Sequence, residues 1–168
     1  MSKNTFKRAH ESFAITIKAP SEAIFPLACP VEEEKWIWEA SDYTMIYSES
    51  GTNEKNCIFS EEMSAPHLMG PGDAGSTCWV TTRYDKDNFV IHWVHVRRST
   101  IGIYELSLRE KNAHETELML DMTLTAIKEE ANARFDENMR ERMRMMMEYI
   151  GRSLKHYCET GTRLASVR

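Results

Sequence analysis

An amphipathic pattern in the C-terminal part of the chain limits the possible folds more than any other feature of the sequence. Apolar side chains recur there at intervals of three and four, which is the spacing of one helical face. Lys155 and His156 fall in the last turn and Gly161 lies just beyond it, which predicts a helix from about 128 to 158. At 1.5 Å per residue this helix is roughly 45 Å long, so another large element must wrap around it. The apolar positions are Ala131, Phe135, Met139, Met143, Met146, Met147, Ile150, Leu154 and Tyr157.

In much of the preceding sequence, apolar and polar residues alternate with a period of two, which is typical of half-buried strands. A first strand is predicted from Phe13, ending at Ala19–Pro20. Two short helices follow, one that Ser21 can cap and that Pro26 interrupts, and one that Pro30 opens. Further strands are predicted at 42–49, 56–62, 76–84, 89–97, 102–110 and 117–127. Short linkers join antiparallel neighbours, so we expect an α+β fold in which a curved, seven-stranded antiparallel sheet grips the C-terminal helix.

Two segments of this pattern allow more than one interpretation. Glu32, Glu33 and Glu34 lie in the first turn of the second short helix, where negative charge suits the helix dipole. A solvated helix start is favoured there over a metal site. The stretch 63–75 is rich in Gly and Pro, and a mobile loop at a pocket mouth and a plain surface connection explain it equally well.

Composition and charge exclude several classes of function. The net charge is −5, and acidic residues interrupt the arginines of 134–152, so nucleic-acid binding is not expected. No apolar run approaches ~20 residues, and the N-terminus has no apolar core of a signal peptide. The four cysteines lack C-x-x-C spacing, which favours reduced thiols in a cytoplasmic protein. We expect no metal and no cofactor.

The alternation also predicts which face of the sheet is buried. A hairpin loop at 85–88 pairs Tyr84 with Phe89, and Trp79 and His92 then point outward. The inner pairs predicted by this register are Val80 with Trp93, Cys78 with His95 and Thr82 with Ile91. The last two strands give a cleaner apolar inner face, made of Tyr104, Leu106, Leu108, Leu118, Leu120, Met122 and Leu124.

We expect a cavity between this inner face and the helix, because a bent sheet cannot lie flush against a straight helix. Five of the eleven methionines lie between Met139 and Met147, and flexible thioethers suit a surface that adapts to a guest. Ordinary core packing is the alternative explanation of this methionine cluster. The residues predicted to line the cavity are Val80, Ile91, Trp93, His95, Tyr104, Leu106, Leu120, Met122, Phe135, Met139, Met143 and Met146.

Two of these residues are candidates for catalysis. His92 and His95 stand three apart on a strand and point to opposite faces, so they cannot chelate one ion together. His95 alone could act as a general acid or base, and Tyr104 could hydrogen-bond a ligand carbonyl or carboxylate. A core histidine and tyrosine with internal partners is the competing interpretation.

The order of these elements resembles the helix-grip fold of the START and polyketide-cyclase-like superfamily, often labelled SRPBCC. The similar stretches, which match one bacterial branch of that group, are Pro20–Ser21, 24–33 with Trp36, Tyr47–Gly51, Trp79–Asp85 and Leu154–Glu159. The resemblance runs from about Phe13 to Glu159, within one domain that covers residues 1–168. It implies a cavity for a small hydrophobic or amphipathic molecule. The superfamily includes lipid carriers, plant ligand-binding proteins, polyketide cyclases and chaperone ATPase activators, so the fold does not decide the function.

Three hypotheses follow from the sequence and the resemblance. The leading one is a module that binds a lipid, an aromatic or a polyketide-like molecule in the cavity. The second is a cyclase or hydratase that uses His95 or Tyr104 in acid–base chemistry. The third is a protein-interaction module similar to the chaperone activators. A homodimer is also possible, with Met145 and Trp79, both predicted to point outward, on its surface.

Overall fold

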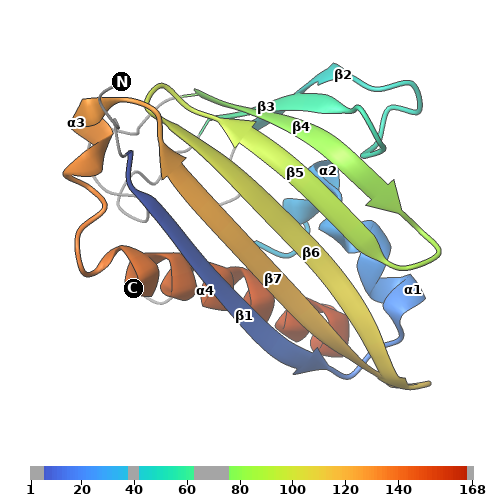
Figure 1. Ribbon diagram of the computed structural model, residues 1–168. Helices are drawn as coiled ribbons and strands as arrows, with labels where there is room; N and C mark the ends of the chain where they lie inside the picture. Colours follow the sequence, from blue (N-terminus) through green and yellow to red (C-terminus); the bar gives the residue numbers. More distant parts are fainter. Residues whose placement is uncertain (1–5, 38–41, 63–75, 166–168) are drawn as a thin grey trace.

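The computed structural model describes residues 6–37, 42–62 and 76–165, which form one antiparallel sheet and a set of helices packed against it (Figure 1). The strand order is β1-β7-β6-β5-β4-β3-β2. The strands are β1 (Arg8–Ile17), β2 (Asp42–Tyr47), β3 (Ile58–Glu62), β4 (Ser76–Asp85), β5 (Val90–Val96), β6 (Thr100–Asn112) and β7 (Glu115–Ala126). The helices are α1 (Ser21–Ile24), the 3-10 helix η1 (Phe25–Ala28), α2 (Pro30–Glu33), α3 (Glu129–Asn132) and α4 (Met139–Thr160).

The architecture confirms the predicted fold. The sheet has seven strands, every paired neighbour is antiparallel, and α4 runs along one of its faces (Figure 1). The short helices contribute to the same core, because Ile24, Phe25 and Trp36 are buried together with residues of α4. The segment 63–75, predicted as either a mobile loop at a pocket mouth or a plain surface connection, lies outside the described residues.

The C-terminal helix is divided, so the prediction of one continuous helix from 128 to 158 is wrong. α3 ends at Asn132 and α4 begins at Met139. Between them, the N–H of Asn138 donates to the Asp136 side chain at 3.0 Å, and the N–H of Met139 donates to the Asp136 carbonyl at 3.2 Å. These local bonds satisfy N–H groups that the start of a helix leaves open, and they turn the chain. With 22 residues, α4 is roughly 33 Å long.

Gly161 follows the end of α4 as predicted, but the helix runs to Thr160, so Lys155 and His156 lie before its last turn. Gly161 caps the helix in the left-handed conformation, with a φ of 72°, and its N–H donates to the Tyr157 carbonyl at 2.8 Å. Along the helix, Glu148 and Arg152, which stand four residues apart, form an ion pair at 2.5 Å. The side chain of Met145 is 59% exposed, which confirms that it points away from the sheet. The buried methionines of α4 are Met139, Met143, Met146 and Met147.

The first short helix begins differently from the prediction. Pro20 is the N-cap of α1, and no side chain caps the helix, so Ser21 does not have the predicted capping role. The Ser21 hydroxyl is buried and lies 3.2 Å from the hydroxyl of Thr116 on β7. Pro26 does not end the helical segment, because the chain continues through it as the 3-10 helix η1. Pro30 opens α2 as predicted.

The pairing of β4 with β5 differs from the prediction because of a β-bulge at Thr82. The turn occupies 86–89, with Phe89 at a φ of 51°, and Tyr84 pairs with Ile91. The register then shifts between Thr81 and Arg83. An extra residue in one strand moves every side chain beyond it to the opposite face. The predicted pairs of Val80 with Trp93, Cys78 with His95, Thr82 with Ile91 and Tyr84 with Phe89 are wrong, as is the outward direction of Trp79. The observed pairs are Tyr84 with Ile91, Thr81 with Trp93 and Trp79 with His95.

The inner face of the last two strands is as predicted. Tyr104, Leu106 and Leu108 of β6 pair with residues of β7 and are buried. Their partners, also buried, are Met122, Leu120 and Leu118. These two strands keep a regular register as far as Glu110, so the period of two assigned their faces correctly.

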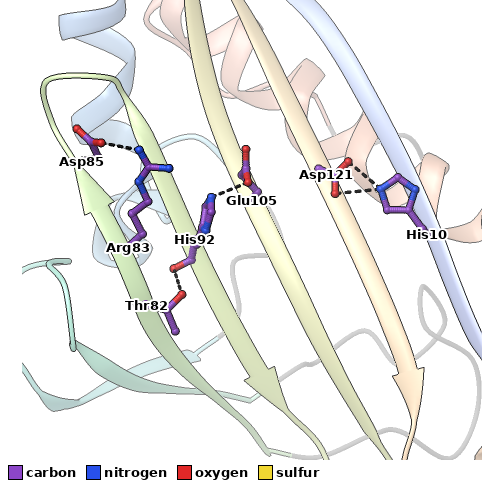
Figure 2. A network of polar contacts seen from close by, with 7 residues as sticks. All are labelled: His10, Thr82, Arg83, Asp85, His92, Glu105 and Asp121. Carbon is purple, nitrogen blue, oxygen red and sulfur yellow. Dashed lines mark hydrogen bonds and ion pairs between the residues drawn. The ribbon is translucent and has the colours of Figure 1, made fainter.

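The outer face of the sheet carries charged pairs (Figure 2). His92 lies 2.5 Å from the Glu105 carboxylate on the neighbouring strand, and His10 lies 2.9 Å from Asp121. His95, in contrast, is 1% exposed on the inner face. The prediction that the rings of His92 and His95 point to opposite faces is confirmed.

Candidate functional site

A cavity of about 100 Å³ lies between the inner face of the sheet and the helices, and it is partly open to solvent. Residues from α2, from α4 and from the strands β2 to β7 contribute to its wall. The described residues that line it are Pro30, Glu33, Tyr43, Phe59, Glu61, Trp79, Trp93, His95, Arg97, Tyr104, Met122, Met146 and Ile150. The cavity therefore lies towards the β2 and α2 end of the sheet, with α4 reaching it through Met146 and Ile150.

The predicted lining residues divide into three groups. Those that line the cavity are Trp93, His95, Tyr104, Met122 and Met146. Those that are buried in the core away from it are Ile91, Leu106, Leu120, Phe135, Met139 and Met143. Val80 lies on the outer face. The bulge at Thr82 reverses the faces of the β4 residues before it, so Trp79 points inward and Val80 points outward. Phe135 and Met139 also border a more open surface depression of about 590 Å³ beside the start of β1.

The register of the sheet assembles an aromatic row along one side of the cavity. Phe59 of β3 pairs with Trp79 of β4, and Trp79 pairs with His95 of β5. The rings of Phe59 and Trp79 stack with centroids 5.9 Å apart, and those of Trp79 and His95 with centroids 4.5 Å apart. Tyr43 extends the row, with its ring centroid 5.8 Å from that of Phe59. A flat aromatic guest would meet complementary ring surfaces here.

The position of the His95 ring depends on a glycine on the next strand. Gly102 of β6 pairs directly with His95, and a Cβ built on Gly102 would overlap the imidazole ring. The ring therefore occupies the space that any other residue at position 102 would fill. Gly102 thus lets His95 lie against the sheet and face Trp79, without filling the cavity.

Burial keeps His95 uncharged. Burial, and secondarily the positive charge of Arg97, lower the pKa of His95 to about 3. Neither ring nitrogen has a hydrogen-bond partner among the described residues. Neutral imidazole carries one N–H donor and one acceptor, so His95 keeps one of each in the cavity wall.

Tyr104 and Trp93 offer two more polar groups in the adjacent row. Their rings stack with centroids 5.8 Å apart, and both residues are buried. The Tyr104 hydroxyl and the Trp93 indole N–H have no hydrogen-bond partner in the described part of the chain. Burial, and secondarily the negative charge of Glu33, raise the pKa of Tyr104 far above its usual range. Tyr104 is therefore a neutral hydrogen-bond donor.

Glu33 brings a carboxyl group to the same cavity from α2. The hydroxyl of Tyr43 donates a hydrogen bond to Glu33 Oε2 at 2.5 Å. Burial raises the pKa of Glu33 to about 8, the Tyr43 hydrogen bond opposes this change, and the negative charge of Glu61 adds to it. The prediction that Glu32–Glu34 is simply a solvated helix start is wrong for Glu33, which is half-buried and protonated at neutral pH.

A sequence signal for Glu33 did exist. Glu33 stands three and four residues before Trp36 and Ile37, which are both buried, and positions at this spacing share one face of a helix. The N–H of Ile37 donates to the Glu33 carbonyl at 2.9 Å, which continues the helical pattern past α2. Because all three residues of Glu32–Glu34 are acidic, the sequence pattern suggested that Glu33 faces solvent.

A second carboxyl group lies on the strand side of the cavity. Glu61 of β3 is 7% exposed, and its Oε2 accepts a hydrogen bond from the Trp79 indole at 2.7 Å. Arg97, just after β5, is 7% exposed and also lines the cavity. The wall thus combines aromatic surface with two carboxyl groups, one guanidinium group and several neutral donors.

Two further features are absent from the residues that the structure describes. Within 6–37, 42–62 and 76–165, no group of three or more His, Cys, Asp or Glu side chains could hold a metal ion. In the same residues, no helix is long and apolar enough to cross a membrane.

Comparison with known proteins finds likeness at the level of structure. No family model matches the sequence, and no curated protein matches it. The Zhui aromatase/cyclase of Streptomyces sp. R1128 has a TM-score of 0.68 and 11% identity, over 91% of this chain and 94% of its own. A START superfamily protein of Mycobacterium smegmatis has a TM-score of 0.67 and 12% identity, over 91% and 99%. Norcoclaurine synthase of Thalictrum flavum has a TM-score of 0.67 and 6% identity, over 95% and 99%.

These matches span nearly the whole of each chain and confirm the resemblance seen in the sequence. The chain has the helix-grip fold that these proteins share. At identities of 6% to 12%, the likeness establishes the fold and leaves the function to the residues of the cavity.

Proposed function

We propose that this protein binds a small aromatic molecule that carries an oxygen acceptor, such as a carbonyl or phenol oxygen. The observation that carries the proposal is the set of buried polar groups on the cavity wall without a partner among the described residues: Trp93 Nε1, both nitrogens of His95 and the Tyr104 hydroxyl. A buried donor left unpaired costs about 1–3 kcal/mol. A guest oxygen that accepts hydrogen bonds from these groups removes part of that cost.

The shape of the cavity supports an aromatic guest over a long lipid. An apolar cavity of about 150 Å³ holds one benzene molecule. A cavity of about 100 Å³ is smaller than that, so even a single ring fills it and extends in part through the opening. The row of Tyr43, Phe59 and Trp79 rings gives such a guest surfaces to stack on. A lipid chain would need more enclosed volume than the wall provides.

Other proteins with this fold are compatible with the proposal. The Streptomyces protein is described as an aromatase/cyclase, and norcoclaurine synthase has been crystallised with dopamine and hydroxybenzaldehyde. These ligands belong to those proteins, and they illustrate that the helix-grip fold can accommodate single aromatic rings. For this chain, the binding-module hypothesis remains the leading one.

A matched pair of ligands tests the proposal. Acetophenone and ethylbenzene have similar shapes, but only acetophenone carries an acceptor oxygen. We expect the protein to bind acetophenone roughly tenfold more tightly, which corresponds to about 1.4 kcal/mol, in titrations followed by NMR chemical shifts. Tyr104→Phe should reduce this preference while leaving the affinity for ethylbenzene unchanged. Equal affinities for the two ligands in the wild-type protein, or no binding of either, would contradict the proposal.

The other hypotheses stay predictions. The pKa values of His95 and Tyr104 favour hydrogen-bond donation over the acid–base role that the cyclase or hydratase hypothesis gives them. A homodimer surface, if present, cannot use Trp79 as predicted, because Trp79 lines the cavity. No observation singles out a protein partner for the chaperone-activator hypothesis.

A further inference from the structure

We infer that the cavity catalyses proton transfer at the carbon next to a ligand carbonyl, with Glu33 as the base and Tyr104 and His95 as donors to the enolate oxygen. This inference rests on the proposed function, because the carbonyl compound must first occupy the cavity. It adds a reaction to the binding and assigns Glu33 a role that neither the sequence pattern nor the resemblance suggested.

The inference depends first on where the groups lie. Glu33 comes from α2, and Tyr104 and His95 come from β6 and β5, yet all three line one cavity of about 100 Å³. Glu33 is near enough to Tyr104 for its negative charge to contribute to the raised pKa of that hydroxyl. A one-ring ketone in this volume therefore has a carboxyl group and neutral donors within the same small space, as enolisation requires.

Glu33 has the properties of a base that works near neutral pH. Its pKa of about 8 makes its carboxylate a stronger base than that of an exposed glutamate, and it is about half ionised near pH 8. The Tyr43 hydroxyl donates to Oε2 and fixes the orientation of the carboxyl group. No described residue hydrogen-bonds the other oxygen, Oε1, which remains for the substrate proton.

Tyr104 and His95 have the complementary properties. The pKa of Tyr104 is raised and that of His95 is lowered by burial, so both stay neutral across the physiological pH range. Neutral donors that are buried in the wall stabilise a developing negative charge without releasing a proton. The stacked rings of Trp93 and Trp79 hold Tyr104 and His95 in place before the substrate arrives.

The step conserves atoms and electrons without a further reactant. The Glu33 carboxylate takes a proton from the carbon next to the carbonyl, and the C–H electron pair becomes the C=C bond of the enolate. The C=O π pair moves to the oxygen, which accepts hydrogen bonds from Tyr104 and His95. Return of the proton from Glu33 to the carbon completes the cycle. In D₂O the carboxyl group exchanges its proton with solvent, so deuterium enters that carbon.

The groups around Glu33 determine the pH dependence of this step. Tyr43 hydrogen-bonds the carboxyl group and lowers its pKa, whereas the charge of Glu61 raises it. Tyr104, His95 and Arg97 complete the titratable and charged groups of the described cavity wall. Of these, Glu33 has its pKa near 8, so we expect the exchange rate to rise with pH up to about pH 8 and then to level off.

The test uses 1-phenylpropan-2-one in D₂O, with binding measured by chemical-shift titration and deuterium uptake at the benzylic carbon measured by ¹H NMR. We expect the wild-type protein to accelerate exchange over buffer, and Glu33→Gln to lose at least roughly tenfold of that acceleration while still binding the ketone. Glu34→Gln, which changes the exposed neighbouring carboxylate, should exchange at the wild-type rate. Circular dichroism checks that each variant is folded.

A second variant keeps the test decisive if Glu33→Gln folds poorly. Tyr43→Phe removes the hydrogen bond that lowers the Glu33 pKa, so its pH–rate profile should move to higher pH. Binding of the ketone without accelerated exchange, or wild-type exchange in Glu33→Gln, would overturn the inference and leave the proposed function standing. Failure of the ketone to bind would overturn both.

Discussion

Glu33 holds a proton at neutral pH, because burial in the cavity wall raises its pKa from 4.5 to about 8. The unfolded chain loses this proton near pH 4.5, whereas the folded protein keeps it until about pH 8. Between these values the unfolded state binds fewer protons, so the free energy of unfolding contributed by Glu33 falls as the pH rises. Above the folded pKa, this contribution no longer changes with pH.

Glu33→Gln should therefore stabilise the protein at higher pH. Glutamine keeps a similar shape without a charge to bury, so we expect a higher unfolding midpoint than that of the wild type at about pH 8 and a smaller difference at about pH 5. Urea unfolding followed by circular dichroism measures both midpoints, with Glu34→Gln as the control at an exposed position. A difference of the same size at both pH values would show that the Glu33 carboxyl does not titrate as described.

The sequence identified some of the polar residues of the site and missed others for a definite reason. His95 and Tyr104 were found because the period of two places them on the inner face. Their lack of internal partners, however, depends on side chains from β4 and β7. Glu33 was missed because a carboxyl group is normally exposed. Its hydrogen-bond partner Tyr43 and the nearby charge of Glu61 lie on β2 and β3, and the pattern of α2 does not show them.

α4 packs closely against β1 because Gly151 stands at the contact. A Cβ at this position would lie 2.7 Å from Cε1 of Phe13 and 3.4 Å from Cγ2 of Ile15. Glycine inside a helix costs about 1 kcal/mol of stability relative to alanine. The close packing of α4 on β1 that Gly151 allows offsets this cost. The helix and the strand therefore depend on each other through one small residue.

A double-mutant cycle tests this contact. We expect Gly151→Ala to destabilise the wild-type protein by about 1–3 kcal/mol, because the overlap with Phe13 outweighs the gain in helix propensity. In a Phe13→Ala background the overlap disappears, and the same substitution should become neutral or stabilising. Urea unfolding of the four proteins gives the coupling energy. Stabilisation by Gly151→Ala in the wild-type background would contradict the packing argument.

The elements differ in how well their periodicity predicted them. β6 and β7 followed the period of two closely, because both present one buried and one exposed face. β4 did not, since an extra residue at Thr82 cannot be seen in the alternation of side chains and reverses the faces of everything before it. The sequence predicted that the long helix continues through 133–138. Hydrogen bonds to Asp136 turn the chain there and divide the helix into α3 and α4.

The whole molecule keeps a hollow between its two layers, and this hollow lies at one end of them. The methionines of α4 were expected to line it together, but Met146 does so while Met143 is fully buried in the core. Most of the inner face is closed by direct packing of the helices on the strands. A substitution meant to fill the cavity must therefore be placed at Met146.

Met146→Trp should fill the cavity and prevent ligand binding. The larger ring projects from α4 into the space of about 100 Å³, so we expect acetophenone to bind at least roughly tenfold more weakly than to the wild type. Met145→Trp, one residue along on the exposed side of the same helix, should bind as the wild type does. Titration followed by NMR measures both. Unchanged affinity in Met146→Trp would place the ligand elsewhere.

The sequence by itself determined the two layers, the antiparallel arrangement and the number of strands, and the inward side of α4. These features depend on hydrophobic periodicity, which is a local property of each segment. Tertiary structure alone decided which of the buried residues border the cavity. That choice depends on a bulge at Thr82, on the space that Gly102 leaves for His95, and on the strands that bury Glu33. Each of these is a relation between residues on different elements, and the pattern within one segment does not encode it.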